Sequence, residues 1–453
     1  MASAKSPPHV AFLAFPFGGH ASCLFTLARA LAAAVPFAAF SFFNTGRSNS
    51  GLLRSTPSGP PPNLRIYDVP DGLSEEGPWL PPPEEVRLFL EMTPGNFIEA
   101  MAAAEGEFGK VSCFIGDCFL WFAGDVAAER SASWVAVRTG GTTSLAAHIY
   151  TDLLRQKVGV DDQGRGNDLV DFIPGLESMR VRDLPDGIVF GDTKSVFPTL
   201  LHRMGQELPR ANCVVLNTFE GLNPSLDSEF QSKFMKCLHV GPLSLLLPQT
   251  PSSDKHGCLE WLDTQKEASI VYICFGSVIN PPPRELAEIA AGLEASGVQF
   301  IWSLKDVARV HLPPGFLDRV AGRGLVVPWA PQKEVLAHFA IGAFLTHCGW
   351  SSILESIVGG VPLLCRPFFG DQPMNARAVS HVWKIGIVFE GGVVKKEEMV
   401  NALNVILKAD AGKKMRVNVN QLKIMALQAT MPGGSTVKNF DALGRMIQGC
   451  QGS

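Results

Sequence analysis

Several features that mark particular protein classes are missing from this sequence. Its 453 residues contain no run of 18 apolar side chains, so no ordinary transmembrane helix is expected. The formal net charge is only -4, so nothing indicates a surface for nucleic acid or an anionic membrane. The N-terminus lacks a secretory pattern, because Pro16 and the glycines after it interrupt the first apolar stretch. We therefore expect a cytoplasmic protein with no nucleic-acid partner and no integral membrane association.

Patterns for binding a metal are also absent. The 10 cysteines lie apart, with no C-x-x-C and no Cys/His spacing of a metal site. No Asp-x-Asp motif occurs. Dispersed cysteines within apolar stretches favour buried thiols in a reducing compartment. We therefore expect neither a metal nor a bound cofactor.

What the sequence does contain is apolar runs that alternate with helical patterns. Hydrophobic residues make up 46% of the chain, and its length suits two domains of about 200 residues each. Strand–turn–helix units begin at residues 10–15 and again at 269–275. This alternation predicts an α/β fold with two doubly wound parallel sheets. We divide the chain into an N-terminal domain 1–244, a linker 245–255, a C-terminal domain 256–435 and a last helix 436–453.

The segment 329–372 contains the most informative pattern. A predicted strand ends at His347, and Ser352 and Glu355 have the S-x-x-E spacing of a capping box, so we expect a helix to begin near Ser351 or Ser352. The free N–H groups and positive dipole of such a helix start bind anions. His347 and Ser352 would be additional donors to a diphosphate. Taken alone, this corner is more often an ordinary capped turn.

Flanking residues supply groups for the rest of a nucleotide sugar. Trp329 can stack on a base, Gln332 can contact a base edge or a ribose hydroxyl, and Glu355 can accept from both ribose hydroxyls. Asp371 and Gln372 can hold sugar hydroxyls. A capping role for Glu355 competes with its ribose role, and each residue alone could be a solvated loop group. Their combined order and spacing favour a donor site.

This order and spacing resemble the signature box of plant family 1 UDP-dependent glycosyltransferases. The resemblance implies a GT-B fold, in which two facing Rossmann-like domains enclose a cleft, the C-terminal domain holds the UDP-sugar and the last helix returns to the N-terminal domain. Ser351 stands where the family usually has asparagine, and Gln372 resembles glucose-preferring members. The implied donor-binding residues are Gly19, Thr139, Ser277, Trp329, Ala330, Gln332, His347, Gly349, Trp350, Ser351, Ser352, Glu355, Asp371 and Gln372.

Glycosyl transfer to a hydroxyl requires a base, and histidine has a neutral form available at neutral pH. His20 lies at the first strand–turn–helix corner, where Gly18 and Gly19 allow close approach. Asp117 follows the strand expected at 111–115. A lone histidine in a turn is more often a capping residue, and spacing alone does not pair it with Asp117. The family resemblance implies that the two form a catalytic pair.

Four segments, 14–18, 182–191, 201–204 and 366–372, resemble flavonoid 3-O-glycosyltransferases in particular. This resemblance implies a planar aromatic acceptor between aromatic walls. The implied acceptor-binding residues are Phe15, Phe119, Arg138, His148, Phe197 and Phe369. Better-known relatives carry glutamine in place of Pro83 and Pro185, and often tryptophan in place of Arg138. We therefore expect Arg138 to tune the choice of sugar or acceptor.

Together these resemblances predict an inverting, metal-independent enzyme that transfers glucose from UDP-glucose to the 3-hydroxyl of a flavonoid. We expect the enzyme to be a monomer. UDP-galactose or another sugar, and another phenolic acceptor, stay open as alternatives. A non-catalytic protein that binds nucleotide sugars is a further alternative. An NAD-dependent dehydrogenase is disfavoured, because the turn at residues 17–22 does not fit G-x-G-x-x-G.

Overall fold

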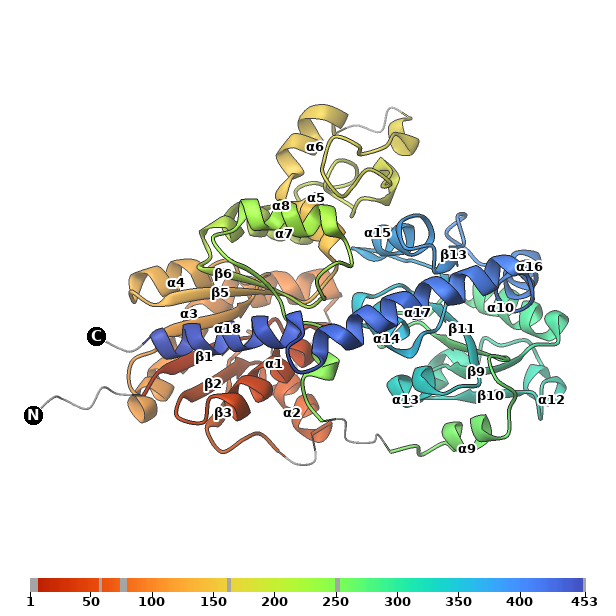
Figure 1. Ribbon diagram of the computed structural model, residues 1–453, viewed down its shortest axis with the longest axis horizontal. Coiled ribbons are helices and arrows are strands. Elements are labelled where there is room, and N and C mark those ends of the chain that lie inside the picture. The colour runs from red at the N-terminus through yellow and green to blue at the C-terminus, as the bar shows by residue number, and fades with distance from the viewer. Residues whose placement is uncertain (1–6, 57–58, 74–79, 161–163, 249–252, 451–453) are drawn as a thin grey trace, which may run out of the picture.

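A computed structural model of the chain describes residues 7–56, 59–73, 80–160, 164–248 and 253–450. Two parallel sheets lie side by side with helices packed around them (Figure 1), which confirms the expected α/β architecture. The 7-stranded sheet has the order β3 (Leu64–Asp68), β2 (Ala39–Asn44), β1 (His9–Leu13), β4 (Cys113–Asp117), β5 (Ser133–Arg138), β6 (Cys213–Leu216) and β7 (Cys237–His239). The 6-stranded sheet has the order β10 (Gly324–Val327), β9 (Gln299–Ser303), β8 (Ile270–Cys274), β11 (Ile341–Thr346), β12 (Leu363–Cys365) and β13 (Gly386–Val388).

Helices connect the strands in both halves of the chain. Those of the first half are α1 (His20–Ala34), α2 (Gly46–Arg54), α3 (Pro82–Phe108), α4 (Ala123–Glu129), α5 (Thr142–Ile149), α6 (Thr151–Val158), α7 (Val196–Glu207) and α8 (Pro224–Lys233), with short turns η1 (Arg165–Asn167), η2 (Val181–Asp183), η3 (Leu208–Arg210) and η4 (Leu243–Leu245). Those of the second half are α9 (Cys258–Asp263), α10 (Pro283–Ser296), α11 (Asp306–Arg309), α12 (Phe316–Arg319), α13 (Gln332–Ala337), α14 (Trp350–Gly359), α15 (Gln372–Arg377), η5 (Ala378–Val382), α16 (Lys396–Lys408), α17 (Asp410–Thr430) and α18 (Ser435–Gly449). None of the helices among the described residues combines the length and apolarity needed to cross a membrane.

The central strands are buried on both faces. β1 and β4 are buried along their whole length, which explains why β1 reads in the sequence as a continuous apolar run. Ala11 and Leu13 enter one hydrophobic core, while Val10 and Phe12 enter the core on the other side of the sheet. A continuous apolar strand therefore fixes the middle of each sheet, and the polar residues that follow it are held at the sheet edge.

The strand order reverses between β1 and β4 in the first sheet and between β8 and β11 in the second. At such a point the loops after neighbouring strands diverge and leave a crevice at the carboxyl ends of the strands. His20 follows β1 and Asp117 ends β4. Ser277 follows β8 and His347 follows β11. The two crevices thus place the predicted base and the predicted phosphate contacts at comparable positions in the two halves.

The last two helices run across both halves of the molecule (Figure 1). α17 packs against α14 and α16 in the second half, whereas α18 packs against β7 in the first. Leu443 and Ile447 of α18 enter the core of the first half, and the Thr436 hydroxyl donates to the Gly241 carbonyl at 2.7 Å. The C-terminal helices therefore join the two halves covalently and by packing.

One expectation needs correction. α14 begins at Trp350 with Gly349 as its N-cap and without a side-chain capping bond, so the predicted capping box of Ser352 and Glu355 does not form. Glu355 accepts a hydrogen bond from Gln332 instead.

The strands β3, β7 and β13 were not expected from the sequence. Of the expected linker 245–255, residues 249–252 lie outside the described part of the chain.

Candidate functional site

His20 is the first residue of α1, directly after the turn that leaves β1. Gly18 has φ 59°, a left-handed conformation that suits glycine, and this bend brings the imidazole back over the carboxyl end of the sheet. The His20 side chain is 23% exposed. It is therefore held by the turn yet partly exposed.

Asp117 lies beside His20, as the family resemblance implied. Its Oδ2 is 2.7 Å from Nδ1 of His20, and its Oδ1 accepts from the Phe119 backbone N–H at 3.0 Å. A carboxylate can only accept, so Nδ1 of His20 carries the proton and Nε2 keeps its lone pair. Nε2 has no hydrogen-bond partner in the part of the chain that the structure describes. The geometry leaves Nε2 available to take a proton from a hydroxyl.

Thr139 completes the surroundings of the base. Its hydroxyl lies 3.0 Å from Nδ1 of His20, because β5 is the neighbour of β4 and ends one residue before Thr139. The preceding residue, Arg138, is only 3% exposed. Thr139 was predicted to contact the transferred sugar, and its position beside His20 is compatible with that role.

Aromatic rings form one wall beside the base. The rings of His20 and Phe119 lie 4.5 Å apart, and Phe15 lies 5.2 Å from Phe119 and 5.3 Å from His20. By contrast, Phe197 is only partly buried, Phe369 is 51% exposed, and neither makes a ring contact with this group among the described residues. The structure therefore groups two of the four predicted aromatic walls with the base.

His148 lies buried on α5. Burial, together with the nearby Arg138 cation, lowers the pKa of its imidazole to about 3. The ring is thus neutral at physiological pH. It can exchange hydrogen bonds with an acceptor without adding charge to the cleft.

A cleft of about 380 Å³ lies at the carboxyl edge of the second sheet. Five of the predicted donor residues line it: Ser277, Trp329, Ala330, Gln332 and Glu355. Trp329 is 49% exposed, so its indole face is available for stacking on a planar base. The cleft therefore brings together the residues that were assigned to the base, the ribose and one phosphate.

The ribose side of this cleft is held by a small polar network. Gln332 donates to Oε2 of Glu355 at 2.7 Å and to the Ser352 hydroxyl at 3.2 Å. The Tyr272 hydroxyl donates to Gln332 at 3.3 Å. Burial raises the pKa of Glu355, while the bond from Gln332 opposes that rise. These contacts orient the Glu355 carboxylate toward the cleft, where it can accept hydroxyl protons.

His347 is confined between two glycines. A Cβ on Gly276 would lie 2.9 Å from the His347 ring, and one on Gly349 would lie 2.4 Å from its Nε2. Gly276 also has φ 77°, a conformation that favours glycine. Burial lowers the pKa of His347 to about 4. The ring is therefore neutral and offers one N–H donor at the start of α14.

The two halves meet at the start of α14. The Ser351 hydroxyl lies 3.9 Å from the Cys23 sulfur on α1, and a Cβ on Gly19 would lie 4.0 Å from it. The Trp350 indole N–H donates to the Asn217 carbonyl in the first half at 2.7 Å. The side chain of Trp350 thus spans the interface, and only its backbone remains for the predicted donor contact.

Asp371 and Gln372 lie at the start of α15. Oδ2 of Asp371 accepts from Asn375 at 3.0 Å, and Oε1 of Gln372 accepts from the Phe368 backbone at 2.8 Å. A Cβ on Gly140 would lie 3.2 Å from Oδ2 of Asp371, so this carboxylate reaches across to the loop after β5. Of the two predicted sugar contacts, Asp371 therefore faces the base corner, which we define as His20, Asp117 and Thr139.

Sequence reasoning missed several residues of the donor cleft. Lys305 follows β9, lines the cleft and donates to the Ser277 carbonyl. Tyr272, Asn280 and Lys333 also line it. Lys305 could have been found from its place directly after a predicted strand, since ligands bind at strand carboxyl ends. Tyr272 gave no such signal, because it reads as an interior strand residue.

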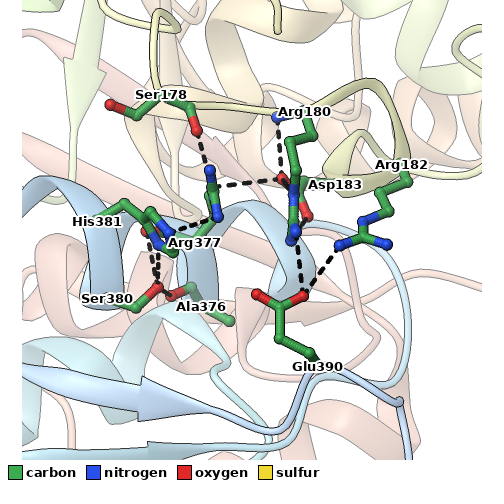
Figure 2. Close-up of polar contacts among 9 residues, drawn as sticks. All are labelled: Ser178, Arg180, Arg182, Asp183, Ala376, Arg377, Ser380, His381 and Glu390. Carbon is green, nitrogen blue, oxygen red and sulfur yellow. Dashed lines mark hydrogen bonds and ion pairs between the residues drawn. The ribbon is translucent and has the colours of Figure 1, made fainter. Parts of the chain in front are cut away.

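A second contact between the halves lies in a cluster of ionic residues (Figure 2). Arg180, just before η2, and Arg182, within η2, donate to Glu390 at 3.1 and 3.2 Å. Arg377 of α15 donates to the Ser178 carbonyl at 2.8 Å. These bonds join the segment before α7 to α15 and to the loop after β13. We call the five residues Ser178, Arg180, Arg182, Arg377 and Glu390 the interdomain ion cluster.

Comparison with protein families agrees with this geometry. Residues 87–426 match the family model described as UDP-glucoronosyl and UDP-glucosyl transferase. The chain is 49% identical over 441 residues to a flavonol 3-O-glucosyltransferase of Arabidopsis thaliana, with 96% of each chain covered. It is 48% identical over 446 residues to an anthocyanidin 3-O-glucosyltransferase of Vitis vinifera, with 98% of each covered.

A solved structure resembles the fold over nearly its whole length. The crystal structure of a UDP-glucose: anthocyanidin 3-O-glucosyltransferase in complex with UDP superposes with a TM-score of 0.92 at 37% identity. The match covers 98% of this chain and 100% of the other. The two proteins therefore share the same overall fold.

Proposed function

The chain belongs to the UDP-glucoronosyl and UDP-glucosyl transferase family, and on this basis we propose that it transfers glucose from UDP-glucose to the 3-hydroxyl of a flavonoid aglycone with inversion of configuration. The family membership makes it a UDP-glycosyltransferase. The sugar, the acceptor position and the roles of individual residues are our proposal. Two relatives that are nearly half identical carry names of flavonoid 3-O-glucosyltransferases, which supports the acceptor class.

His20 is the proposed general base. Nε2 takes the proton of the acceptor hydroxyl while its oxygen attacks the anomeric carbon, and the bond from that carbon to UDP breaks with the electron pair leaving on the β-phosphate. Asp117, at 2.7 Å from Nδ1, fixes the tautomer and stabilises the imidazolium that forms. General base catalysis of this kind contributes roughly 10²–10⁴-fold to the rate.

The leaving diphosphate would be held by the start of α14. Its backbone N–H groups and dipole favour an anion, the neutral His347 adds one donor, and Ser277 lies across the cleft in the turn after β8. Lys305 brings a cation to the same turn. These groups can stabilise the charge that develops on UDP without a metal ion.

The acceptor would lie against Phe119, which packs on the buried ring of Phe15. Because Phe119 packs on the His20 ring at 4.5 Å, a planar aromatic acceptor stacked on this wall would present an edge hydroxyl to Nε2. Apolar burial and ring stacking suit a flavonol or an anthocyanidin. Neutral His148 can bind a second acceptor hydroxyl.

One observation carries this proposal. The His20–Asp117 pair lies at the switch point of the first sheet, and Gly19 beside it faces Ser351 at the helix start that follows the switch point of the second. A base and an anion site that belong to different halves thus lie next to each other where the halves meet. Transfer between an acceptor and a phosphate-linked sugar requires this combination.

Product analysis tests the proposal. We expect incubation with UDP-glucose and quercetin to yield UDP and one β-linked 3-O-glucoside, identified by mass spectrometry and NMR. UDP-galactose and the other phenolic acceptors form the comparison arms, and we expect a lower kcat/KM with each. A product linked elsewhere, or α-linked, would refute the proposed regiochemistry or inversion. Tight UDP binding with no transfer to any acceptor would favour a non-catalytic binding protein.

A further inference from the structure

A second cavity, of about 210 Å³, lies where the two halves meet. Its charged lining consists of Arg180, Arg182 and Asp183 from the first half and Arg377 and Glu390 from the second (Figure 2). No residue of the described chain lines both this cavity and the 380 Å³ donor cleft. Sites for drug-sized ligands measure roughly 300–1,000 Å³. The volume of this cavity therefore suits a small ion rather than a nucleotide.

The charges that line this cavity do not balance. Three arginines face two carboxylates, which leaves a surplus of one positive charge. His381 contacts Arg377 but adds no charge. A guanidinium only donates, so Nε2 of His381 accepts from Nη1 of Arg377 at 2.6 Å and the imidazole is neutral. Burial, together with the Arg180 cation, lowers the pKa of Arg377. The cavity is therefore electropositive.

The two carboxylates compensate the three arginines unevenly. Asp183 holds Arg180 in a bidentate pair, at 2.8 and 2.9 Å. One oxygen of Glu390, Oε2, accepts from both Arg180 and Arg182. Arg377 is only 12% exposed in its side chain, and its Nε lies 3.7 Å from Asp183, beyond hydrogen-bonding distance. Of the three cations, Arg377 is therefore the one with the weakest carboxylate partner.

Unused donors from both halves remain at this cavity. Nε and Nη1 of Arg182 and Nη2 of Arg377 have no hydrogen-bond partner in the part of the chain that the structure describes. The other two nitrogens of Arg377 donate to the Ser178 carbonyl and to His381. Because these donors come from separate elements, a tetrahedral anion with oxygens in several directions suits them better than a planar carboxylate.

We propose that this cavity binds a tetrahedral oxyanion of the phosphate type, free or esterified, which bridges Arg182 of the first half and Arg377 of the second. Arginine forms short, charge-assisted hydrogen bonds with phosphate oxygens. The bound oxyanion neutralises the surplus charge and adds hydrogen bonds across the junction that Glu390 already spans. This site is separate from the proposed diphosphate site at the start of α14, and its binding does not depend on glycosyl transfer.

Calorimetric titration of the full chain measures this binding. The protein is saturated with UDP throughout, so that the proposed diphosphate site is occupied. Inorganic phosphate is the probe for the free anion and glycerol 3-phosphate is the probe for the ester, and the tighter of the two identifies the source. Acetate at equal ionic strength controls for screening. We expect at least one phosphate probe to bind the wild type and to raise its melting temperature, and acetate to do neither.

Variants that change the charge in opposite directions test the assignment. We expect Arg182→Gln and Arg377→Gln each to weaken phosphate binding by about tenfold or more, because each removes charged donors. Glu390→Gln removes a competing negative charge, so binding should tighten by about threefold or more. Arg87→Gln is the control for Arg182→Gln and should match the wild type. The two arginine side chains are 49% and 47% exposed, and Arg87 likewise pairs with an exposed glutamate, Glu91.

Four results would overturn the proposal: no binding of either phosphate probe to the wild type, acetate binding as tight as phosphate binding, equal phosphate affinity in the wild type and Arg182→Gln, or weaker phosphate binding in Glu390→Gln. A lower melting temperature in Arg377→Gln with unchanged phosphate affinity would also overturn it and assign Arg377 a structural role. The proposed function fails in a different way, namely if the wild type transfers no sugar from UDP-glucose to any flavonoid.

Discussion

The donor cleft and the base corner differ in how the chain assembles them. Most donor residues come from the single segment 329–372, in which β11, the turn at His347 and α14 follow each other directly. The base corner brings together His20, Asp117 and Thr139. In the sequence, Asp117 lies 97 residues and Thr139 lies 119 residues after His20. Only the sheet order places β1, β4 and β5 side by side. The site thus combines donor residues that are close in sequence with base-corner residues that come together only when the first sheet folds.

This difference explains what could be predicted from the sequence. The local segment carries its own pattern, so the helix start, the histidine and the lining residues Trp329 and Gln332 were predicted from it and lie at the second switch point or in the cleft. The pairing of His20 with Asp117 was not predictable from spacing, because it depends on the register of strands distant in sequence. Family resemblance supplied that pairing, and the distance of 2.7 Å agrees with it.

The remaining differences arise from tertiary competition. The capping box failed because Gln332, from another helix, donates to Glu355. Trp350 was assigned to the donor, but Asn217 in the other half accepts its indole N–H. β3 lies at the sheet edge and is buried only at Leu64, and β7 and β13 are only 3 residues long, so none presents a long apolar run. Each case depends on contacts that a single stretch of sequence does not record.

The largest effect is expected from breaking the base corner at Asp117. Asp117→Asn removes the carboxylate that holds the Nδ1 proton of His20. The tautomer in which Nε2 has a free lone pair is then no longer favoured. We predict a fall in kcat of roughly 10²–10⁴-fold, measured with UDP-glucose and quercetin. The matched control is Asp152→Asn, since Asp152 also bonds a histidine, His202, at 2.8 Å but its side chain is 70% exposed. Comparable losses in both variants would contradict the assignment.

The next largest effect is expected on donor binding, from a substitution at Gly349. A Cβ there would lie 2.4 Å from Nε2 of His347, so Gly349→Ala must displace the imidazole or the helix start. We predict that UDP binds about tenfold more weakly or worse, measured by calorimetric titration. Gly51→Ala in α2, where no atom lies within 4 Å of the new Cβ, should leave UDP affinity unchanged. Unaltered affinity in Gly349→Ala would separate His347 from donor binding.

A smaller effect concerns stability at acid pH. The pKa of His148 is lowered to about 3 in the folded protein, so between pH 6.5 and 3 the unfolded chain binds more protons than the folded one. The free energy of unfolding therefore falls as pH decreases, by at most about 1.4 kcal/mol per pH unit for this group. We predict a shallower fall in His148→Gln, measured by urea unfolding between pH 6.5 and 4.5. Identical slopes would contradict the burial of a neutral His148.

The smallest effect is expected from the interdomain ion cluster, which both halves share. Glu390 is 49% exposed in its side chain, so Glu390→Gln should cost no more than about 1 kcal/mol of stability. Because the lost bonds join the halves, we predict a rise of up to about threefold in KM for both substrates. Glu91→Gln removes a similarly exposed pair within α3, with Arg87, and should leave KM unchanged. Equal kinetics in the two variants would show that the cluster does not align the halves.

The central claim is that the two halves divide the work, with the base on the first sheet and the donor on the second. One preparation of His20→Ala tests it when both the dissociation constant of UDP and kcat are measured. We predict a dissociation constant within about twofold of the wild type and a loss of transfer of at least about 10²-fold. Retained transfer, or a loss of UDP affinity that parallels the loss of transfer, would contradict it.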